Sequence, residues 1–524
     1  MKASPGLKTL CCSLVESRAG LNPRRNICRK IYLSLFLSLL TFFILTAPGA
    51  IHEADGISMY EVTKSIIEKG DFSVPSENVL GTPGLFGKSY SPFGIGQSIL
   101  AIPLYVLGKV LAAGVGLEPR FMTKFTVSLF NPIVTALTCI LISKFCQRFG
   151  LSLKTSIPIS ILYGLGTMAW NYSKTFFSDP LAGLLILGSA YIISLSINGK
   201  YMRNIALSGI LLGVAVTTRI ASIVAIPAFL IYLWSISPKS HRLERFLRSV
   251  TLFSSIITFF LILVGVYNYV RFGSIFNTGY TYEYAGFETP LLQGLYGFLL
   301  SSGRSVFLFN PILILALIPI PKMFREHRKE FILFSLIVVS HLILYSTYRY
   351  WHSNPVWGPR YMLVAVPYLM ILVGFLLENL KTKGMAIMVA FLVILSFFIQ
   401  VSSVLVIYQR YYYDIFLKYE DSYLEKIIYE PRYSPLIGQW REIEFVRQKS
   451  LERGLLKAMA QKQLTASEPQ FESSKERIAH LLQSNVFYNS FHFWLLYLYY
   501  FGFPLKMIIG IFSVLLLYLI RRWQ

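Results

Sequence analysis

Three acidic side chains stand at the edges of apolar blocks, where they could take part in chemistry. Glu53 and Asp55 follow the first long apolar run, and Asp179 precedes Pro180 between two later runs. A carboxylate can act as a general acid or base, and paired carboxylates can hold a divalent cation through their oxygens. Capping of the helices that follow is the structural alternative for Asp55 and Asp179. If both segments face the same side of a membrane, these acids can surround one cavity.

An arginine provides the opposite charge. Arg219 interrupts an apolar run that extends from 205 to 234. Because an arginine is costly at membrane depth, it marks a candidate functional site. The run is too long for one helix, so we expect two short helices with Arg219 at their outer turn. Snorkelling of its side chain toward lipid headgroups is the structural alternative.

The segment 348–361 combines aromatic residues with Arg349 and Arg360. An aromatic belt at the membrane surface explains its Trp and Tyr residues but not its arginines. The planar guanidinium fork of arginine suits phosphate. Arg271 and Arg304 bracket the preceding loop and add to this cationic set. The sequence therefore indicates carboxylates and arginines that face one side of a membrane and bind an anion there.

Long apolar blocks must position these residues. Hydrophobic residues make up 54% of the chain and charged residues only 14%, which excludes a soluble globule. Blocks of about 17–25 apolar residues without two-residue alternation predict an all-α, polytopic membrane protein. We expect about twelve spans, at 31–50, 121–144, 155–171, 180–197, 204–219, 220–236, 249–269, 304–320, 331–347, 361–378, 384–407 and 501–520.

Basic residues set the expected orientation. The net charge is +23, but Lys and Arg cluster between apolar blocks rather than in a basic stripe with aromatics, so no nucleic-acid partner is expected. If 95–115 lies along the outer face without crossing, every basic cluster falls inside. This places both termini in the cytoplasm of a multi-pass plasma-membrane protein. No cysteine lies in a segment placed outside, so no disulfide is expected.

Four regions follow from this topology. We expect a basic cytoplasmic N-terminus at 1–30 and a transmembrane domain at 31–407, whose first outer loop is 51–120. An extracytoplasmic segment, folded as a small domain, covers 408–490, and a final interfacial and transmembrane helix covers 491–524. Within the first loop, apolar residues at helical spacing from Ile57 to Ile67 predict an amphipathic helix on the membrane surface.

Several of these segments resemble one family. The segments 52–60 and 70–72 resemble the first outer loop of C-type (GT-C) membrane glycosyltransferases, in the branch of protein O-mannosyltransferases and lipid A aminoarabinose transferase. The segment 171–180 resembles that branch's second acidic loop, and 209–219 its helix pair with a basic turn. The segments 268–280 and 357–361 are similar to parts of its bacterial and archaeal members.

The resemblance implies a GT-C-like bundle, with juxtamembrane helices on its outer face, that transfers a sugar from a polyprenyl-phosphate donor. The acceptor would be a glycan, lipid or protein outside the cytoplasm, beside membrane lipids. Asp55 matches the acidic catalytic position as general base, with Glu53 nearby and Asp179 as a second acid or metal ligand. One departure is Gly56, because the branch often has an Asp-Glu pair here.

The implied donor phosphate would be held by Arg219, Arg360 and Arg349, which stabilise the charge that grows on the leaving group. No cofactor is required by these residues, although a divalent metal could bind between the acids and the phosphate. Two other classes stay open. A lipid-linked sugar flippase or transporter would use the same arginines without a base, and a polysaccharide polymerase or ligase would also carry large outer loops.

Overall fold

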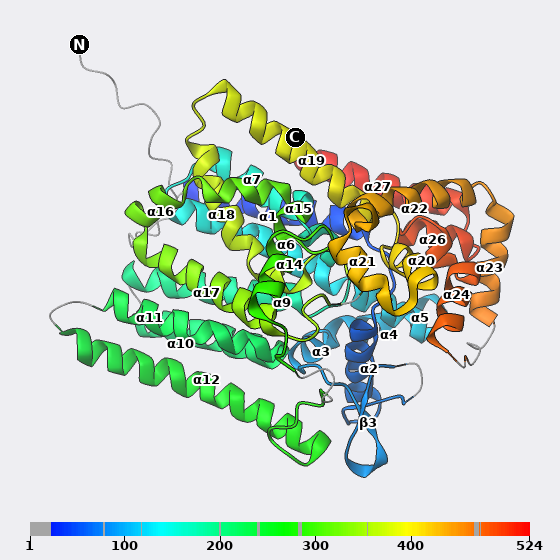
Figure 1. Cartoon of the computed structure of the whole chain (residues 1–524), viewed down its shortest axis with the longest axis horizontal. Coiled ribbons are helices and arrows are strands. Elements are labelled where there is room, and N and C mark those ends of the chain that lie inside the picture. Colours follow the sequence, from blue (N-terminus) through cyan, green and yellow to red (C-terminus); the bar gives the residue numbers. More distant parts are fainter. Residues whose placement is uncertain are drawn as a thin grey trace.

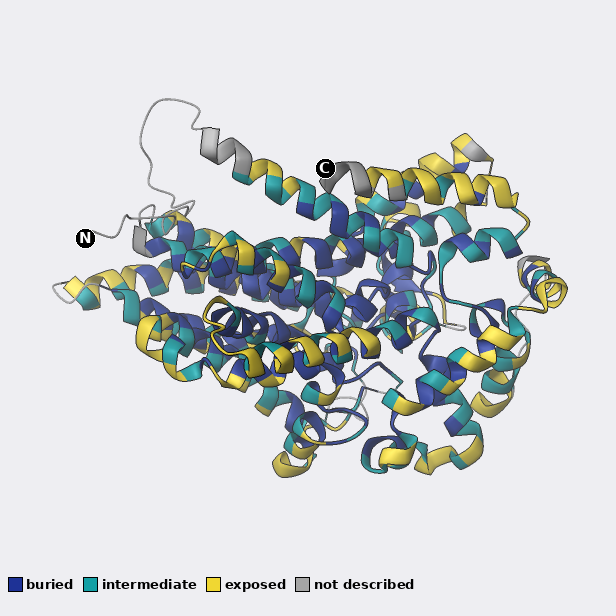
Figure 2. Cartoon of the chain, turned by 90° about the horizontal axis from the view of Figure 1, so that it is seen from above, coloured by how far each residue is buried: buried dark blue, intermediate teal, exposed yellow. Residues whose placement is uncertain are grey.

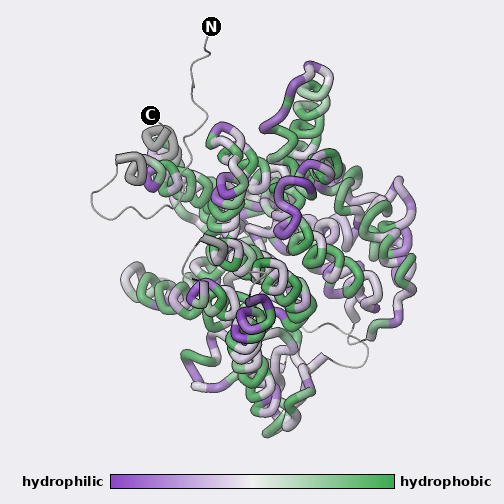
Figure 3. The backbone as a smooth tube through the Cα atoms, turned by 90° about the vertical axis from the view of Figure 1, so that its left-hand side faces the viewer, coloured by the Kyte–Doolittle hydropathy of each residue, from purple (hydrophilic) through white to green (hydrophobic). Residues whose placement is uncertain are grey.

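The computed structural model describes residues 23–76, 79–116, 118–198, 201–237, 241–280, 286–353, 355–465, 471 and 473–523. Helices dominate it (Figure 1), and hydrophobic residues cover most of their length (Figure 3). Among the described residues, six helices are long and apolar enough to cross a membrane, by length and composition, and five apolar helices are shorter. The expected all-α, polytopic membrane fold is confirmed. The number of crossings, about twelve, stays a prediction.

The helices of the bundle correspond to most of the expected spans. They are α1 (Pro23–Thr46), α6 (Phe130–Arg148), α7 (Leu153–Gly166), α9 (Asp179–Ser194), α10 (Tyr201–Thr218), α11 (Ile226–Ile236), α12 (Arg242–Phe272), α17 (Arg328–Thr347), α18 (Val366–Glu378), α19 (Lys383–Leu405) and α27 (Leu505–Trp523). Several are cut short by proline or by polar residues, so their lengths differ. α7, with 14 residues, is about 21 Å long, which is less than the bilayer core.

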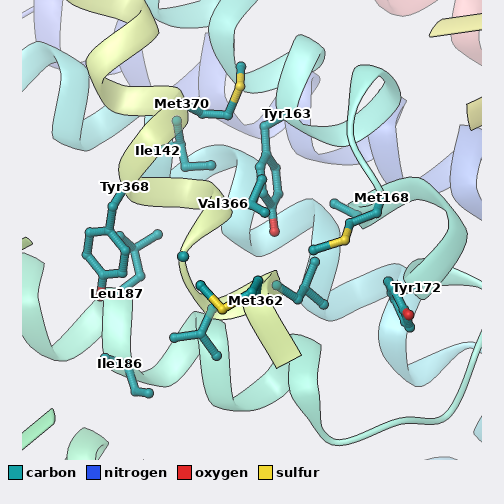
Figure 4. Close-up of a cluster of buried hydrophobic side chains, with 14 of the residues drawn as sticks. Ile142, Tyr163, Met168, Tyr172, Ile186, Leu187, Met362, Val366, Tyr368 and Met370 are labelled. Atoms are coloured by element: carbon teal, nitrogen blue, oxygen red, sulfur yellow. The ribbon is translucent and has the colours of Figure 1, made fainter. Parts of the chain in front are cut away.

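The core lies between α6, α7, α9 and α18. Figure 4 shows Ile142, Tyr163, Leu187 and Met370 in this cluster, and all are buried. By contrast, α12 lies at the edge of the bundle (Figure 1), and few of its residues are buried. Figure 2 shows buried residues gathered inside the bundle and exposed residues along its outer helices. Glycine allows α12 to approach α10: a Cβ atom at Gly213 would lie 2.0 Å from the Phe260 ring.

The expected span 304–320 is wrong as a single helix. It consists of α15 (Val306–Phe309), the 3₁₀ helix η5 (Pro311–Leu317) and α16 (Ile320–Glu326). Pro311 has no N–H to continue a helix. The break is stabilised by other elements, because Asn310 Oδ1 accepts a hydrogen bond from the Met168 N–H at 2.7 Å.

The first loop forms a layer at the end of the bundle that carries the candidate site. It contains α2 (Ala54–Glu68), a small antiparallel sheet of β1 (Ser73–Val74), β3 (Ser89–Tyr90) and β2 (Thr82–Pro83) in that order, η1 (Leu85–Gly87), α3 (Gly96–Leu100), α4 (Ile102–Val115) and α5 (Pro119–Ser128). The expectation that the α2 helix lies on the surface is wrong. Its faces are covered by the loop itself: Ser58 bonds Ser91 at 2.8 Å, and Tyr60 bonds Thr123 at 2.7 Å.

The non-crossing of 95–115 stays a prediction. α4, with 14 residues, extends about 21 Å, the same length as α7. α4 packs against α5, and Val106, Leu107 and Val110 stay exposed.

The segment 408–490 is helical. It contains α20 (Gln409–Tyr419), the 3₁₀ turn η7 (Glu420–Ser422), α21 (Tyr423–Tyr429), the 3₁₀ turn η8 (Pro431–Tyr433), α22 (Pro435–Lys449), α23 (Arg453–Thr465), α24 (Ser474–Ser484) and α25 (Val486–Asn489), followed by α26 (Trp494–Tyr500). A buried ion pair of 2.6 Å joins Arg410 to Glu442. Backbone bonds from His492 to Leu405 and from Trp494 to Ala47 return the chain to the bundle. Cys139 and Cys146 are free thiols, but Cys28 is disulfide-bonded, so the expectation of no disulfide is wrong there.

Candidate active site

Four of the six predicted site residues come together at one end of the bundle. Asp55 lies in the first turn of α2, and Asp179 is the first residue of α9. Arg219 lies between α10 and the 3₁₀ helix η3 (Ile220–Ala225), as expected from the interrupted apolar run. Arg360 begins the 3₁₀ helix η6 (Arg360–Val364). Each charge therefore stands where a helix begins or breaks.

These four side chains form a chain of alternating charge, which we call the four-residue network. Arg360 Nη1 donates to Asp55 Oδ2 at 2.8 Å, and Arg360 Nε lies 3.6 Å from Asp179 Oδ2. Arg219 Nη1 lies 3.2 Å from Asp179 Oδ1. Asp179 thus pairs with both arginines, whereas Asp55 pairs with Arg360 alone.

The network is buried at its centre and accessible at its ends. The Asp179 side chain is 1% exposed and that of Arg360 8%, against 17% for Arg219 and 23% for Asp55. Both Asp179 oxygens and Arg360 Nε lie close to opposite charge without a well-aligned hydrogen bond among the described residues. The Asp179 oxygens, which can only accept, hold the arginines in place by charge, and the Arg360 Nε–H keeps its capacity to donate a hydrogen bond to an anionic ligand.

Two glycines of the first loop fix the helix break at Arg219. A Cβ atom at Gly94 would lie 2.4 Å from the Thr217 carbonyl oxygen, and one at Gly96 would lie 2.3 Å from Thr218 Oγ1. The loop can pack against the last turn of α10 only because both positions lack a side chain. This contact joins the loop that follows α2 to the Arg219 turn.

Aromatic side chains surround the arginines. Arg219 Nε donates to the Tyr345 hydroxyl at 2.7 Å, and the Tyr345 ring stacks on Tyr361 at 4.3 Å with an interplanar angle of 7°. Arg360 lies over the Phe177 ring at 4.2 Å. Tyr345 is not among the site residues that the sequence predicts. The available signal was its position at the end of α17, one turn before the aromatic segment that holds Arg360.

Arg304 and Arg271 have a different role from the one expected. Arg304 is fully buried and donates to the His352 carbonyl at 2.6 Å and the Val356 carbonyl at 3.3 Å, so it fixes the segment that leads to Arg360. Arg271 donates to the Tyr267 carbonyl at 3.1 Å. Since carbonyl oxygens occupy both guanidinium groups, we assign these arginines to the framework.

Arg349 is not brought to the network. It forms an ion pair of 3.2 Å with Glu288 in which both side chains are exposed, by 41% and 52%. Its backbone N–H donates to the Gly286 carbonyl at 2.8 Å, which ties this part of the turn to the segment that holds Glu288.

Glu53 lies beside the network and is buried. Burial raises the pKa of its carboxyl to about 7, and its Oε2 atom has no hydrogen-bond partner among the described residues. A Cβ atom at Gly56 would lie 3.3 Å from this oxygen and 2.9 Å from Ile51 Cγ2. The close packing explains why a second acid, frequent in the resembling family at this position, has no room here.

No metal centre is formed by the described residues: nowhere do three or more His, Cys, Asp or Glu side chains gather closely enough. Asp55 and Asp179 could each offer oxygens, but arginines already neutralise both. The donor set of this site does not fit a resident divalent cation.

Comparison with known proteins gives distant structural likenesses. No protein-family model and no curated protein matches the sequence. The chain is similar to the crystal structure of ArnT from Cupriavidus metallidurans in the apo state, at 14% identity and a TM-score of 0.48, over 91% of this chain and 78% of that one. The structure of that ArnT bound to undecaprenyl phosphate gives the same identity and TM-score, over 84% and 81%.

An archaeal protein gives a third likeness. The oligosaccharyltransferase AglB from Archaeoglobus fulgidus, in complex with an inhibitory peptide and a dolichol-phosphate, is 11% identical, over 78% of this chain and 61% of that one, with a TM-score of 0.43. ArnT and AglB are GT-C membrane glycosyltransferases, the family that the sequence resembles. These three TM-scores are below 0.5, so the proposed function rests on this chain's own residues.

Proposed function

We propose that this protein is a membrane glycosyltransferase. It transfers a sugar from a polyprenyl-phosphate donor to a hydroxyl or amine acceptor at the extracytoplasmic face of the plasma membrane. The observation that carries the proposal is the alternation of Asp55, Arg360, Asp179 and Arg219 at the end of an apolar helical bundle. Such a site offers fixed positive charge to a phosphate and a carboxylate to the acceptor.

Arg219 and Arg360 bind the donor phosphate in this proposal. When the sugar–oxygen bond breaks, the electron pair stays on the phosphate, and preorganised donors stabilise its growing charge. Two guanidinium groups can make several charge-assisted hydrogen bonds to phosphate oxygens. Asp179 holds both arginines, because its two oxygens face Arg219 and Arg360 separately.

Asp55 is the proposed general base. It is the most exposed member of the network, so an acceptor can reach it. A phosphate bound to Arg360 competes with Asp55 for that guanidinium, and this frees the carboxylate to take the acceptor's proton. The acceptor oxygen or nitrogen then bonds to the sugar carbon as polyprenyl phosphate departs. Base catalysis of this kind contributes about 10²–10⁴-fold in rate.

The test is donor binding and sugar transfer by purified protein, with a panel of polyprenyl-phosphate sugars. Arg219→Ala should weaken donor binding by about tenfold or more, because a hydrogen bond to a charged group contributes about 1.5–3 kcal/mol. Arg219→Lys should restore only part of the affinity, since lysine lacks the planar fork.

Arg349→Ala is the matched control, because it removes an exposed arginine that lies outside the network. It should leave donor affinity nearly unchanged. If wild type released no sugar from any donor of the panel, the flippase or transporter alternative would replace this proposal. Equal affinities of wild type and Arg219→Ala would remove Arg219 from the phosphate site.

A further inference from the structure

A turn after α12 folds back along the helix that it leaves. The helix ends at Phe272, Gly273 adopts φ +72°, and the chain reverses through Ser274, Ile275 and Phe276. The Asn268 side-chain amide donates to the Ile275 carbonyl at 3.0 Å. A Cβ atom at Gly265 would lie 3.6 Å from Ile275 Cβ, so the turn packs beside Gly265.

This contact shows how far the turn reaches back along α12 from the end of the helix. Gly265 precedes the end of α12 by seven residues, which corresponds to about 10 Å along the helix. α12 is the least buried of the candidate spans among the described residues, and Ile262, Val266 and Tyr269 lie exposed around Gly265 on the same face. The side chain of Phe276, 87% exposed, therefore projects from a surface that must face lipid.

The polar groups of the turn are arranged for a site without water. Backbone groups in lipid need partners inside the protein. The Ile275 carbonyl is bonded by Asn268, the Ser274 carbonyl accepts from the Asn277 N–H at 3.3 Å, and the Asn277 side chain accepts from the Gly279 N–H at 3.0 Å. Ser274 and Asn277 are exposed, but their side-chain oxygens accept from the backbone N–H groups of Phe276 and Gly279, and Ile275 and Phe276 supply the apolar part of the surface.

β2 and β3 form a β-hairpin whose tip is η1. This tip adds a second exposed aromatic ring at the same end of α12. Phe86 in η1 is 85% exposed and adopts φ +61°, a conformation that is uncommon for a bulky residue. A Cβ atom at Gly84 would lie 2.4 Å from the Arg271 carbonyl oxygen, so the tip is packed against the last turn of α12. Figure 1 shows the hairpin and this end of α12 side by side.

We propose that Phe276 and Phe86, with Ile275 and Leu85 beside them, insert into the lipid leaflet next to α12 and form a membrane-embedded lip. The partner is lipid rather than another protein, because the apolar surface is continuous with the exposed face of a membrane-spanning helix. Phenylalanine and leucine side chains are typical of apolar faces that insert at the boundary between headgroups and acyl chains.

The lip is joined to the wall of the site. Thr82 Oγ1 donates to the Gly279 carbonyl at 2.6 Å and ties the hairpin to the end of the turn. The next residue, Tyr280, packs edge-on against Phe93, which directly precedes the Gly94 loop at Arg219. Insertion of the lip would thus anchor this wall to the bilayer.

The test uses Phe276→Cys and Phe86→Cys, each labelled with an environment-sensitive fluorophore in liposomes that contain this protein alone. Leu451→Cys is the matched control, because Leu451 is 74% exposed between α22 and α23. Labelled wild type measures the background from native thiols. Nitroxide groups near the top of the acyl chains should quench positions 276 and 86 several-fold more strongly than 451, and soluble iodide should show the opposite order.

Iodide quenching of either lip position as strong as that of 451 would overturn the proposal, since the surface would then face water and suit a protein partner. If Phe276→Cys failed to fold, Ile275→Cys would report on the same turn. The readout is independent of sugar transfer, so it does not depend on the proposed function.

Discussion

At the scale of single residues, burial separates two acids that lie close in the sequence. Asp55 pairs with Arg360 and is partly exposed, whereas Glu53 is buried without a basic partner within ion-pair distance among the described residues. Burial without an opposite charge stabilises the protonated form of the Glu53 carboxyl. Asp55 is the acid that an acceptor can reach, because its side chain is partly exposed.

Glu53 should make stability depend on pH. Its pKa is about 7 in the folded protein, against an ordinary 4.5, so the folded state holds the proton more tightly. The free energy of unfolding therefore falls as pH rises from about 4.5 to about 7, by up to about 3 kcal/mol at 1.36 kcal/mol per pKa unit. Glu53→Gln, neutral at every pH, should raise the melting temperature at pH 8 and change it little at pH 5.

Thermal unfolding of purified protein across this range measures the effect. Glu288→Gln, at an exposed position, controls for the loss of a carboxylate. A melting-temperature difference between Glu53→Gln and wild type that is constant from pH 5 to pH 8 would contradict the burial argument.

At the scale of elements, contacts between loops and helix breaks position the network. Gly94→Ala should displace the last turn of α10, because its Cβ atom would meet backbone atoms of Thr217 and Thr218 rather than flexible side chains. Overpacking of this kind costs about 1–3 kcal/mol. We expect a lower melting temperature and weaker donor binding, since Arg219 follows directly.

Gly114→Ala is the control for this substitution. Gly114 lies in α4, and no atom lies within 4 Å of the position that a Cβ atom would take there. Alanine also favours a helix over glycine by about 1 kcal/mol. This variant should be neutral or slightly more stable. Wild-type donor affinity and stability in Gly94→Ala would show that the loop does not position Arg219.

The sequence predicts helices better than it predicts their surroundings. The length of the apolar run and the charge within it correctly predict the helix break at Arg219. This prediction needs no knowledge of distant contacts, because the cost of placing an arginine at membrane depth depends on the residue itself. The break at Pro311 and the burial of α2 depend on partners far along the chain, such as Met168 and Thr123. Periodicity alone does not report them.

The same distinction applies to the site. Asp55, Asp179, Arg219 and Arg360 could be grouped from the sequence because each sits at a predicted helix end on one expected side. Arg349 satisfies the same criterion, but its turn directs it toward Glu288. The choice between two arginines of one turn depends on backbone geometry, here on Gly358 with φ +64° and on Arg304, which holds the segment before it.

At the scale of the whole molecule, topology decides which face carries the site. We predict that 95–115 does not cross, so the basic clusters lie in the cytoplasm and the network lies outside. In intact cells, an impermeant thiol reagent should label Leu451→Cys but not Lys154→Cys or Glu244→Cys. Efficient labelling at 154 and 244 would reverse the orientation and place the network in the cytoplasm.

The central claim is that Asp55 takes a proton from an acceptor while the arginines hold the donor. Its most direct test is single-turnover sugar transfer by wild type and Asp55→Asn, with bound donor measured in parallel. The amide keeps the size of the side chain but cannot accept the proton. We predict near-normal donor binding and a transfer rate reduced by about 10²–10⁴-fold, or about 3–5 kcal/mol of barrier. Equal transfer rates in the two proteins would contradict the account.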